Sequence, residues 1–214
     1  MQSQRNSMTP SQITLGAVFE TNSSPYQMRV IAHDETVVMY DTWWPHRGAW
    51  AMSGLRVGTS YCRMPRSLME SGAKYVRLDP LSERELQVHR PDLPFAVAQR
   101  EDLSWYDQPW PTSVFGTEPV LSVGAIYLAP FGPRDTSKSS SLITAKNGAW
   151  FSEDELLARA MELQRPLLGN IRLTDGVGIY RAGIRNKTPS YYIWGARSRL
   201  GAPAKGPSHM ARLL

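Results

Sequence analysis

The sequence has little of several features that commonly announce a function. It holds a single cysteine, Cys62, which excludes an internal disulfide and fits a reducing compartment. Its four histidines lie far apart, and none has the spacing of a metal-ligand pair, so a zinc site is not expected. No hydrophobic run approaches the length of a membrane span, and residues 1–12 lack the apolar middle of a signal peptide. We therefore expect a cytoplasmic protein without a transmembrane segment.

Recognisable catalytic motifs are missing as well. Residues 132–139, GPRDTSKS, resemble a phosphate-binding loop, but Ser137 replaces its second glycine and a strand-like run follows where a helix should begin. Cys62 and His89 would form a nucleophile and base only if the fold brought them together, and neither has a typical nucleophile setting. We therefore predict that the protein is not an enzyme and uses no cofactor or metal.

The positive charge is concentrated in one region. The whole chain has a net charge of +5. Residues 1–169 carry 16 Lys or Arg and 18 Asp or Glu, a balance of −2, whereas residues 170–214 carry eight bases and one acid, a balance of +7. Such asymmetry indicates an acidic partner, which could be nucleic acid, anionic lipid or an acidic protein surface.

Hydrophobic periodicity predicts a mixed α+β fold. The N-terminal half has short runs rich in β-branched and aromatic residues at 13–20, 26–33 and 36–44, separated by turn residues, which predicts a bent antiparallel β-rich half. Short helices are expected at 65–72 and at 81–91, where Ser82 and Glu85 form a capping box.

The C-terminal half is predicted to run strand, loop, strand, helix and β-hairpin. Residues 151–166 give the strongest helix pattern in the chain, with Ser152 and Glu155 as a second capping box and Pro166 as its end. Two strands joined by residues 185–188 would follow as the hairpin.

The predicted domain organisation places a boundary in a proline-containing stretch with little regularity. It comprises a flexible N-terminus, a β-rich domain, a linker, an α+β domain and a flexible basic tail, at 1–12, 13–102, 103–119, 120–200 and 201–214.

Residues 178–199 alternate bases with aromatic rings and contain no acid. Three interpretations remain open: core rings with solvated bases, a protein-binding surface, or a nucleic-acid surface on which bases stack on exposed rings. The residues that would carry a binding surface are Arg181, Arg185, Lys187, Tyr192, Trp194, Arg197 and Arg199.

A second candidate surface is the tryptophan-rich stretch at 40–50, YDTWWPHRGAW. Alternation places Trp43 and Trp44 on opposite faces of a strand, so both faces carry a large ring. Either one ring is core and the other covers a sheet edge, or Trp43 or Trp50 is an exposed anchor for a protein partner.

The stretches SQITLGAVFETNSSPYQMRV, MYDTWWPH and GIYRAGIRNKTPSYYIWGARSRL together resemble plasmid-encoded fertility-inhibition proteins. The resemblance covers most of residues 9–200. It implies a small cytoplasmic protein that inhibits plasmid conjugation by disabling the type IV coupling protein, the ATPase that delivers DNA to the secretion channel. We expect non-enzymatic inhibition through this protein partner. The alternative is a sequence-nonspecific accessory protein of a mobile element with weak nucleic-acid binding.

Overall fold

The computed structural model describes residues 13–22, 24–51, 59–107, 109–110, 116–132, 136–137, 139–170 and 176–196. These residues form an α+β protein, as the sequence predicted, and they divide into two compact units. Unit 1 contains the described residues up to Asp92 together with Gly183–Lys187, and unit 2 contains Leu93–Ala182 and the described residues from Thr188 onward. The predicted flexible ends at 1–12 and 201–214 lie outside the described residues.

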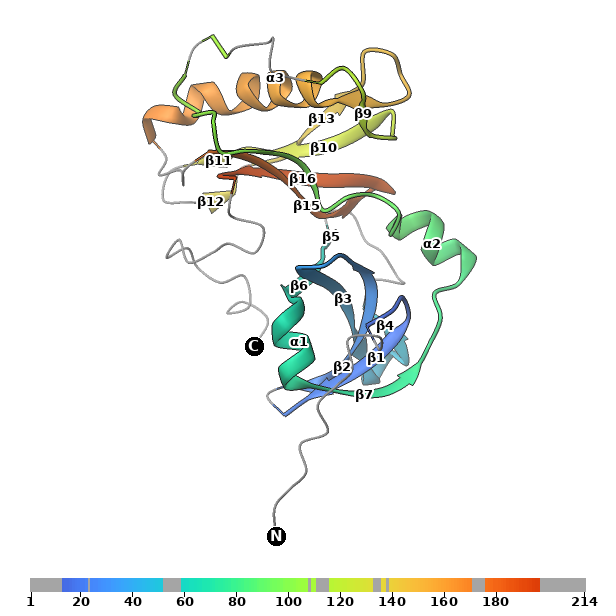
Figure 1. The fold of residues 1–214 in the computed structure, drawn as a ribbon. Coiled ribbons are helices and arrows are strands. Elements are labelled where there is room, and N and C mark those ends of the chain that lie inside the picture. The colour runs from blue at the N-terminus through green and yellow to red at the C-terminus, as the bar shows by residue number, and fades with distance from the viewer. Residues whose placement is uncertain are drawn as a thin grey trace. The chain divides into compact units, whose positions relative to one another are not determined.

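Unit 1 is built on an antiparallel sheet in the order β4-β3-β2-β1-β7, with β6 also paired to β3 (Figure 1). The strands are β1 (Ala17–Thr21), β2 (Ser24–His33), β3 (Val37–Trp44), β4 (Ala49–Trp50), β6 (Cys62–Pro65) and β7 (Ala73–Leu78). Register shifts interrupt the β1–β2, β1–β7 and β2–β3 pairings, and such bulges bend strands. The predicted bent antiparallel sheet is therefore present.

Two short helices and one 3₁₀ turn complete unit 1. They are α1 (Arg66–Gly72), α2 (Glu83–His89) and η2 (Pro45–Arg47). The short strand β5 (Thr59–Ser60) pairs with Gly183 and Ile184 of β15 (Val177–Arg185).

The sheet of unit 1 buries side chains on both faces. One face forms a core around Phe19, Val30 and Met69. Arg29 and Asp41 are also buried, at 2% and 0% exposure, although both are charged types. Successive side chains of a strand point to opposite faces, so Arg29 lies on the face opposite Met28 and Val30. Buried charged residues are uncommon in a core, so this second face of the sheet is a candidate functional region.

Unit 2 holds the predicted strand, loop, strand, helix and hairpin. Its strands are β8 (Ala96–Arg100), β9 (Pro119–Leu121), β10 (Ala125–Ala129), β11 (Phe131–Gly132), β12 (Thr136–Ser137), β13 (Ser141–Thr144), β14 (Phe151–Ser152), β15 and β16 (Thr188–Trp194). The main sheet runs β13-β10-β16-β15, β8 joins β15, and the β10–β16 pairing is parallel.

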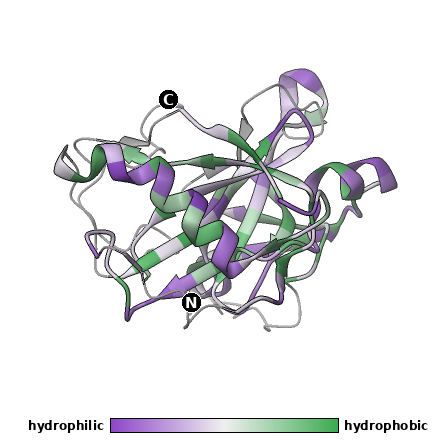
Figure 2. Cartoon of the chain, turned by 90° about the horizontal axis from the view of Figure 1, so that it is seen from above, coloured by the Kyte–Doolittle hydropathy of each residue, from purple (hydrophilic) through white to green (hydrophobic). Residues whose placement is uncertain are grey.

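Helix α3 (Glu153–Gln164) packs its apolar stripe into the core of unit 2, and the 3₁₀ segment η5 (Arg165–Asn170) follows it. Leu156, Leu157 and Ala160 are fully buried there with Tyr191 and Ile193 of the hairpin. Figure 2 shows hydrophobic and hydrophilic residues alternating along this helix, as expected for one buried face.

The two units meet in sequence at Asp92 and Leu93, whereas the sequence placed the change of domain at 103–119. Leu103, Trp105 and Trp110 of that stretch are buried in the core of unit 2, and the Trp110 indole donates to the Ser104 carbonyl at 2.7 Å. The described part of this irregular, proline-containing stretch is therefore packed into unit 2 and is not a linker between domains. Residues 108 and 111–115 of the stretch lie outside the described residues.

Candidate functional site

The turn between β3 and β4 carries the three tryptophans of the 40–50 stretch, and Trp44 lies opposite Ala49. Strand β3 ends at Trp44, η2 turns the chain, and Gly48 takes the left-handed conformation (φ 58) that lets β4 return alongside β3. The register then places Trp43 opposite Trp50. Their rings contact edge to face, with centroids 5.3 Å apart. We call Trp43, Trp44, His46, Arg47 and Trp50 the aromatic corner.

Trp50 is the buried base of the aromatic corner, at 6% exposure. Its indole N–H donates to Asp79 Oδ2 at 2.9 Å, and the Arg29 guanidinium lies over its ring at 4.7 Å from the centroid. A hydrogen bond and a cation–π contact therefore fix this ring from two directions. Trp43 therefore contacts a Trp50 ring that is held in a fixed orientation.

Trp44 is the outward part of the aromatic corner. It is half-buried, and the exposed Arg47 lies over its ring at 4.4 Å while the exposed His46 ring stacks on it at 5.4 Å. Residues 42–50 contain no acid, and the preceding Asp41 is fully buried. The corner is therefore aromatic and cationic at its surface.

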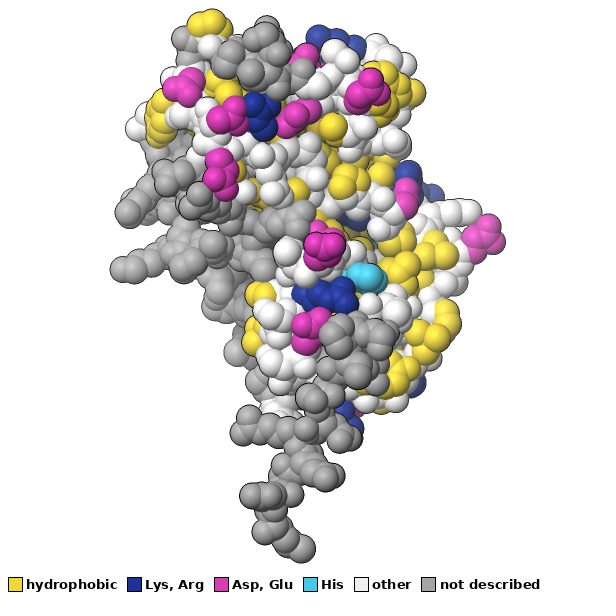
Figure 3. Space-filling model, in the orientation of Figure 1, with side chains coloured by type: hydrophobic (Ala, Val, Ile, Leu, Met, Phe, Trp, Pro, Cys, Tyr) yellow, Lys and Arg dark blue, Asp and Glu magenta, His cyan; other side chains and the backbone are white. Residues whose placement is uncertain are grey.

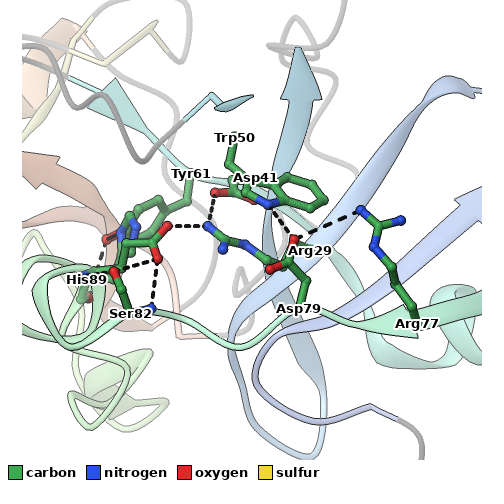
Figure 4. A network of polar contacts seen from close by, with 9 residues as sticks. Arg29, Asp41, Trp50, Tyr61, Arg77, Asp79, Ser82 and His89 are labelled. Carbon is green, nitrogen blue, oxygen red and sulfur yellow. Dashed lines mark hydrogen bonds and ion pairs between the residues drawn. The ribbon is translucent and has the colours of Figure 1, made fainter. Parts of the chain in front are cut away.

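Beneath the corner lies an ionic cluster that we call the Arg29 network: Arg29, Asp41, Asp79, Ser82 and Glu85 (Figure 4). Arg29 and Asp41 are buried, whereas the other three side chains keep some access to solvent. Arg29 and Asp41 are cross-strand neighbours on β2 and β3. The same Arg29 nitrogen, Nη2, donates to Asp41 Oδ2 at 3.2 Å and to Glu85 Oε1 at 2.6 Å. One guanidinium thus serves two carboxyl groups.

The two carboxyl groups of the cluster differ in acidity. Burial raises the pKa of Asp41 to about 7, because the Arg29 charge only partly offsets the loss of water. Burial also pulls the pKa of Glu85 upward, but hydrogen bonds from Arg29 and Ser82 outweigh it, so that pKa lies below its usual value. Glu85 is therefore the ionised partner of Arg29, and Asp41 titrates near neutrality.

The predicted capping box at the start of α2 is confirmed and joins the Arg29 network. Ser82 Oγ accepts from the Glu85 backbone N–H, and Glu85 Oε2 accepts from the Ser82 N–H at 2.8 Å. The other oxygen of Glu85 holds Arg29. One side chain thus caps α2 and ties it to β2.

The hairpin residues predicted as a binding surface are mostly buried. Arg181 is 1% exposed and its Nη1 donates to the Leu93 carbonyl at 3.3 Å, so the expectation that it faces outward is wrong. Tyr192 and Trp194 are buried in a cluster with Tyr180 and Phe131. The sequence missed this because both faces of the hairpin are covered, and alternation predicts only one buried face.

Within the described part of the hairpin, the predicted site residues that reach solvent lie at its tip. Arg185 is half-buried and Lys187 is exposed in a turn where Asn186 and Lys187 both have positive φ. Arg197 and Arg199 lie outside the described residues. The structure pairs the Trp43 and Trp50 rings, and of the described arginines of the strip it buries Arg181 and leaves Arg185 half-buried.

The remaining sequence motifs gain no site from the structure. Part of the phosphate-loop mimic, Lys138 included, lies outside the described residues. Its described flanks pair as β11 and β12, and the predicted strand after it is β13. In the described part of the chain no group of three metal-ligating side chains gathers, and no helix there has the length and apolarity to cross a membrane.

Sequence reasoning missed the Arg29 network, in which Arg29 contacts both Asp41 and Glu85. The capping box was the one part of the network that the sequence indicated, since it predicts that the Glu85 carboxylate bonds to the backbone of Ser82. It does not indicate that the second oxygen of Glu85 binds Arg29. Nothing in the spacing of Arg29 and Asp41 says that they oppose each other across two strands.

Comparison with known proteins identifies no relative: no family model, curated protein or solved structure matches the chain significantly.

Proposed function

We propose that the protein acts by binding a protein partner, without chemistry of its own, and that the aromatic corner is the binding surface. The observation that carries this is the environment of Trp44: the ring is half-exposed, Arg47 lies over it and His46 stacks with it. The preceding residue of β3, Trp43, contacts the ring of buried Trp50. Trp and Arg are the residue types that most often dominate interface energy. Rings already held in place lose little conformational freedom on binding.

The charge of the corner selects the kind of partner. Arg47 and His46 are exposed beside Trp44, and no acid lies between residues 42 and 50. An acidic segment with an apolar side chain to place against the tryptophans fits this surface. Together with the resemblance to fertility-inhibition proteins, this supports inhibition of plasmid conjugation by binding the type IV coupling ATPase. Arg185 and Lys187 at the hairpin tip stay candidates for a second contact.

The described surface offers less to nucleic acid. Arg66, Arg90, Arg100 and Arg159 each lie within ion-pair distance of a carboxylate. On the face shown in Figure 3, lysines and arginines lie scattered among acids and do not form a continuous stripe. A phosphate backbone is best held by a row of unneutralised bases.

The test is a binding titration of the full chain with the purified cytoplasmic part of the coupling ATPase, followed by a mating assay. Trp44→Ala combined with Arg47→Ala should weaken binding by roughly 30-fold, since a central interface truncation removes about 2 kcal/mol. Conjugative transfer should recover in cells that express this variant.

The matched control is Tyr106→Ala, which removes an exposed ring (58%) from unit 2 and should leave binding unchanged. Full binding by the double variant would rule out the aromatic corner. Binding only to a DNA duplex, with affinity that falls steeply as salt rises, would instead support the DNA-binding alternative.

A further inference from the structure

The contact between Arg29 and Asp41 consists of one hydrogen bond, although the two side chains could form two. Cross-strand Arg and Asp side chains commonly form a fork of two parallel hydrogen bonds. Here only Nη2 and Oδ2 meet, at 3.2 Å. Arg29 Nε and Asp41 Oδ1 are both buried, and neither has a hydrogen-bond partner among the residues that the structure describes. The two atoms that would complete the fork are therefore both unused.

The shorter contact of Arg29 goes elsewhere, to Glu85 Oε1 at 2.6 Å. If both carboxylates were ionised, the single charge of Arg29 would leave a net negative charge on a pair in which Asp41 is fully buried and Glu85 is only 15% exposed. If Asp41 carries a proton, the charges of Arg29 and Glu85 cancel and no net charge is left on these three side chains. The long bond to Asp41 and the short bond to Glu85 are the geometry expected when Glu85 is ionised and Asp41 carries a proton.

We propose that Arg29 is the moving part of a proton-linked switch, holding Glu85 while the Asp41 carboxyl carries a proton and closing the two-bond fork onto Asp41 when that proton leaves to solvent. Movement toward Asp41 turns the guanidinium away from Glu85. The tie between β2 and the first turn of α2 is then lost, although Ser82 and Glu85 still cap the helix.

The same movement affects the base of the aromatic corner. Arg29 lies over the Trp50 ring in the structure, so its rotation removes the cation from that ring. The indole of Trp50 stays bonded to the Asp79 carboxylate, which also lies 3.9 Å from the Arg77 guanidinium. Trp50 is thus a natural reporter of the position of Arg29.

Other charged and titratable groups face Asp41, and they set the pH at which the switch operates. Arg29 on β2 favours ionisation, whereas Glu85 on α2 and Asp79 before α2 oppose it. On β6, burial raises the pKa of the Cys62 thiol and Asp41 raises it further, so the thiol stays neutral near pH 7. Burial raises the pKa of Asp41 itself to about 7, which places the transition in the physiological range.

The experiment is an NMR pH titration of the full-length protein that follows the Asp41 carboxyl carbon, the Trp50 indole N–H and the Ser82 amide. We expect the three signals to share one midpoint near neutrality. Asp41→Asn should hold the Trp50 and Ser82 signals at their low-pH positions throughout. Glu85→Gln should move the Asp41 midpoint down, because it removes a neighbouring negative charge.

The matched control is Glu83→Gln, an exposed acid on the same helix, which should leave the shared midpoint in place. The switch is refuted if Asp41 titrates in the ordinary carboxylic range. It is also refuted if the Trp50 and Ser82 signals still titrate in Asp41→Asn. These measurements require no partner, so their failure is distinct from failure of the proposed function.

Discussion

At the scale of single residues, burial overrides charge at two arginines. Arg29 and Arg181 are 2% and 1% exposed, although arginine is among the residues least often buried completely. Arg29 has carboxylate partners, whereas Arg181 donates to a backbone carbonyl, that of Leu93. Removing either side chain leaves an unfilled volume and an unmatched polar group.

We expect Arg181→Ala to lower the free energy of unfolding by about 2 to 4 kcal/mol, from the cavity and from the carbonyl left without its donor. Chemical denaturation measures this. Lys187→Ala is the control, because an exposed turn residue should change stability by less than about 0.5 kcal/mol. Equal stability of the two variants would mean that Arg181 is solvated.

At the scale of elements, the two predicted capping boxes differ. Helix α2 has both reciprocal bonds. At α3, Ser152 accepts from the Glu155 N–H at 3.2 Å, but the Glu155 carboxylate accepts from the Lys146 N–H at 2.7 Å and thus caps the preceding loop. The sequence pattern is the same, and the nearby chain decides where the carboxylate goes.

Helix α3 should therefore depend on Ser152 as its N-cap. Ser152→Ala is expected to lower the free energy of unfolding by about 1 kcal/mol, and Ser152→Asp to retain it, since aspartate also caps. Hydrogen exchange of the Glu155 amide would report the loss locally. Unchanged exchange in the alanine variant would show that packing alone fixes the start of the helix.

At the scale of the whole molecule, each unit has its own core, so the ionic cluster acts on unit 1. Folded Asp41 keeps its proton up to about pH 7, while the unfolded chain loses it near the ordinary value of 3.8. The folded state binds more protons between these values. Stability from this group is therefore present at low pH and is lost as the pH rises through 7.

Between about pH 5 and about pH 8 the wild-type protein should lose roughly 2 to 3 kcal/mol of stability through Asp41, as an upper bound. Asp41→Asn should remove this part of the pH dependence, and Glu83→Gln should not. Denaturation curves at the two pH values provide the measurement. An equal pH dependence in wild type and Asp41→Asn would contradict the raised pKa of Asp41.

The sequence by itself determined the local structure. Alternation and turn residues gave the strands at 13–44, capping pairs and prolines gave the helices near 83 and 153, and the hairpin near 177–194 followed from its strand pattern. These features depend on neighbours within a few residues, so they can be read along the chain. The tryptophans at 43, 44 and 50 were recognised as a group for the same reason.

Only the tertiary structure decided which side chains face water and which charges meet. Arg181, Tyr192 and Trp194 are buried because their hairpin is covered on both faces, which alternation along one strand does not reveal. Arg29, Asp41 and Glu85 come from three elements as many as 56 residues apart. Such contacts depend on strand register and on burial, because a charge is expensive only once water has been excluded from it.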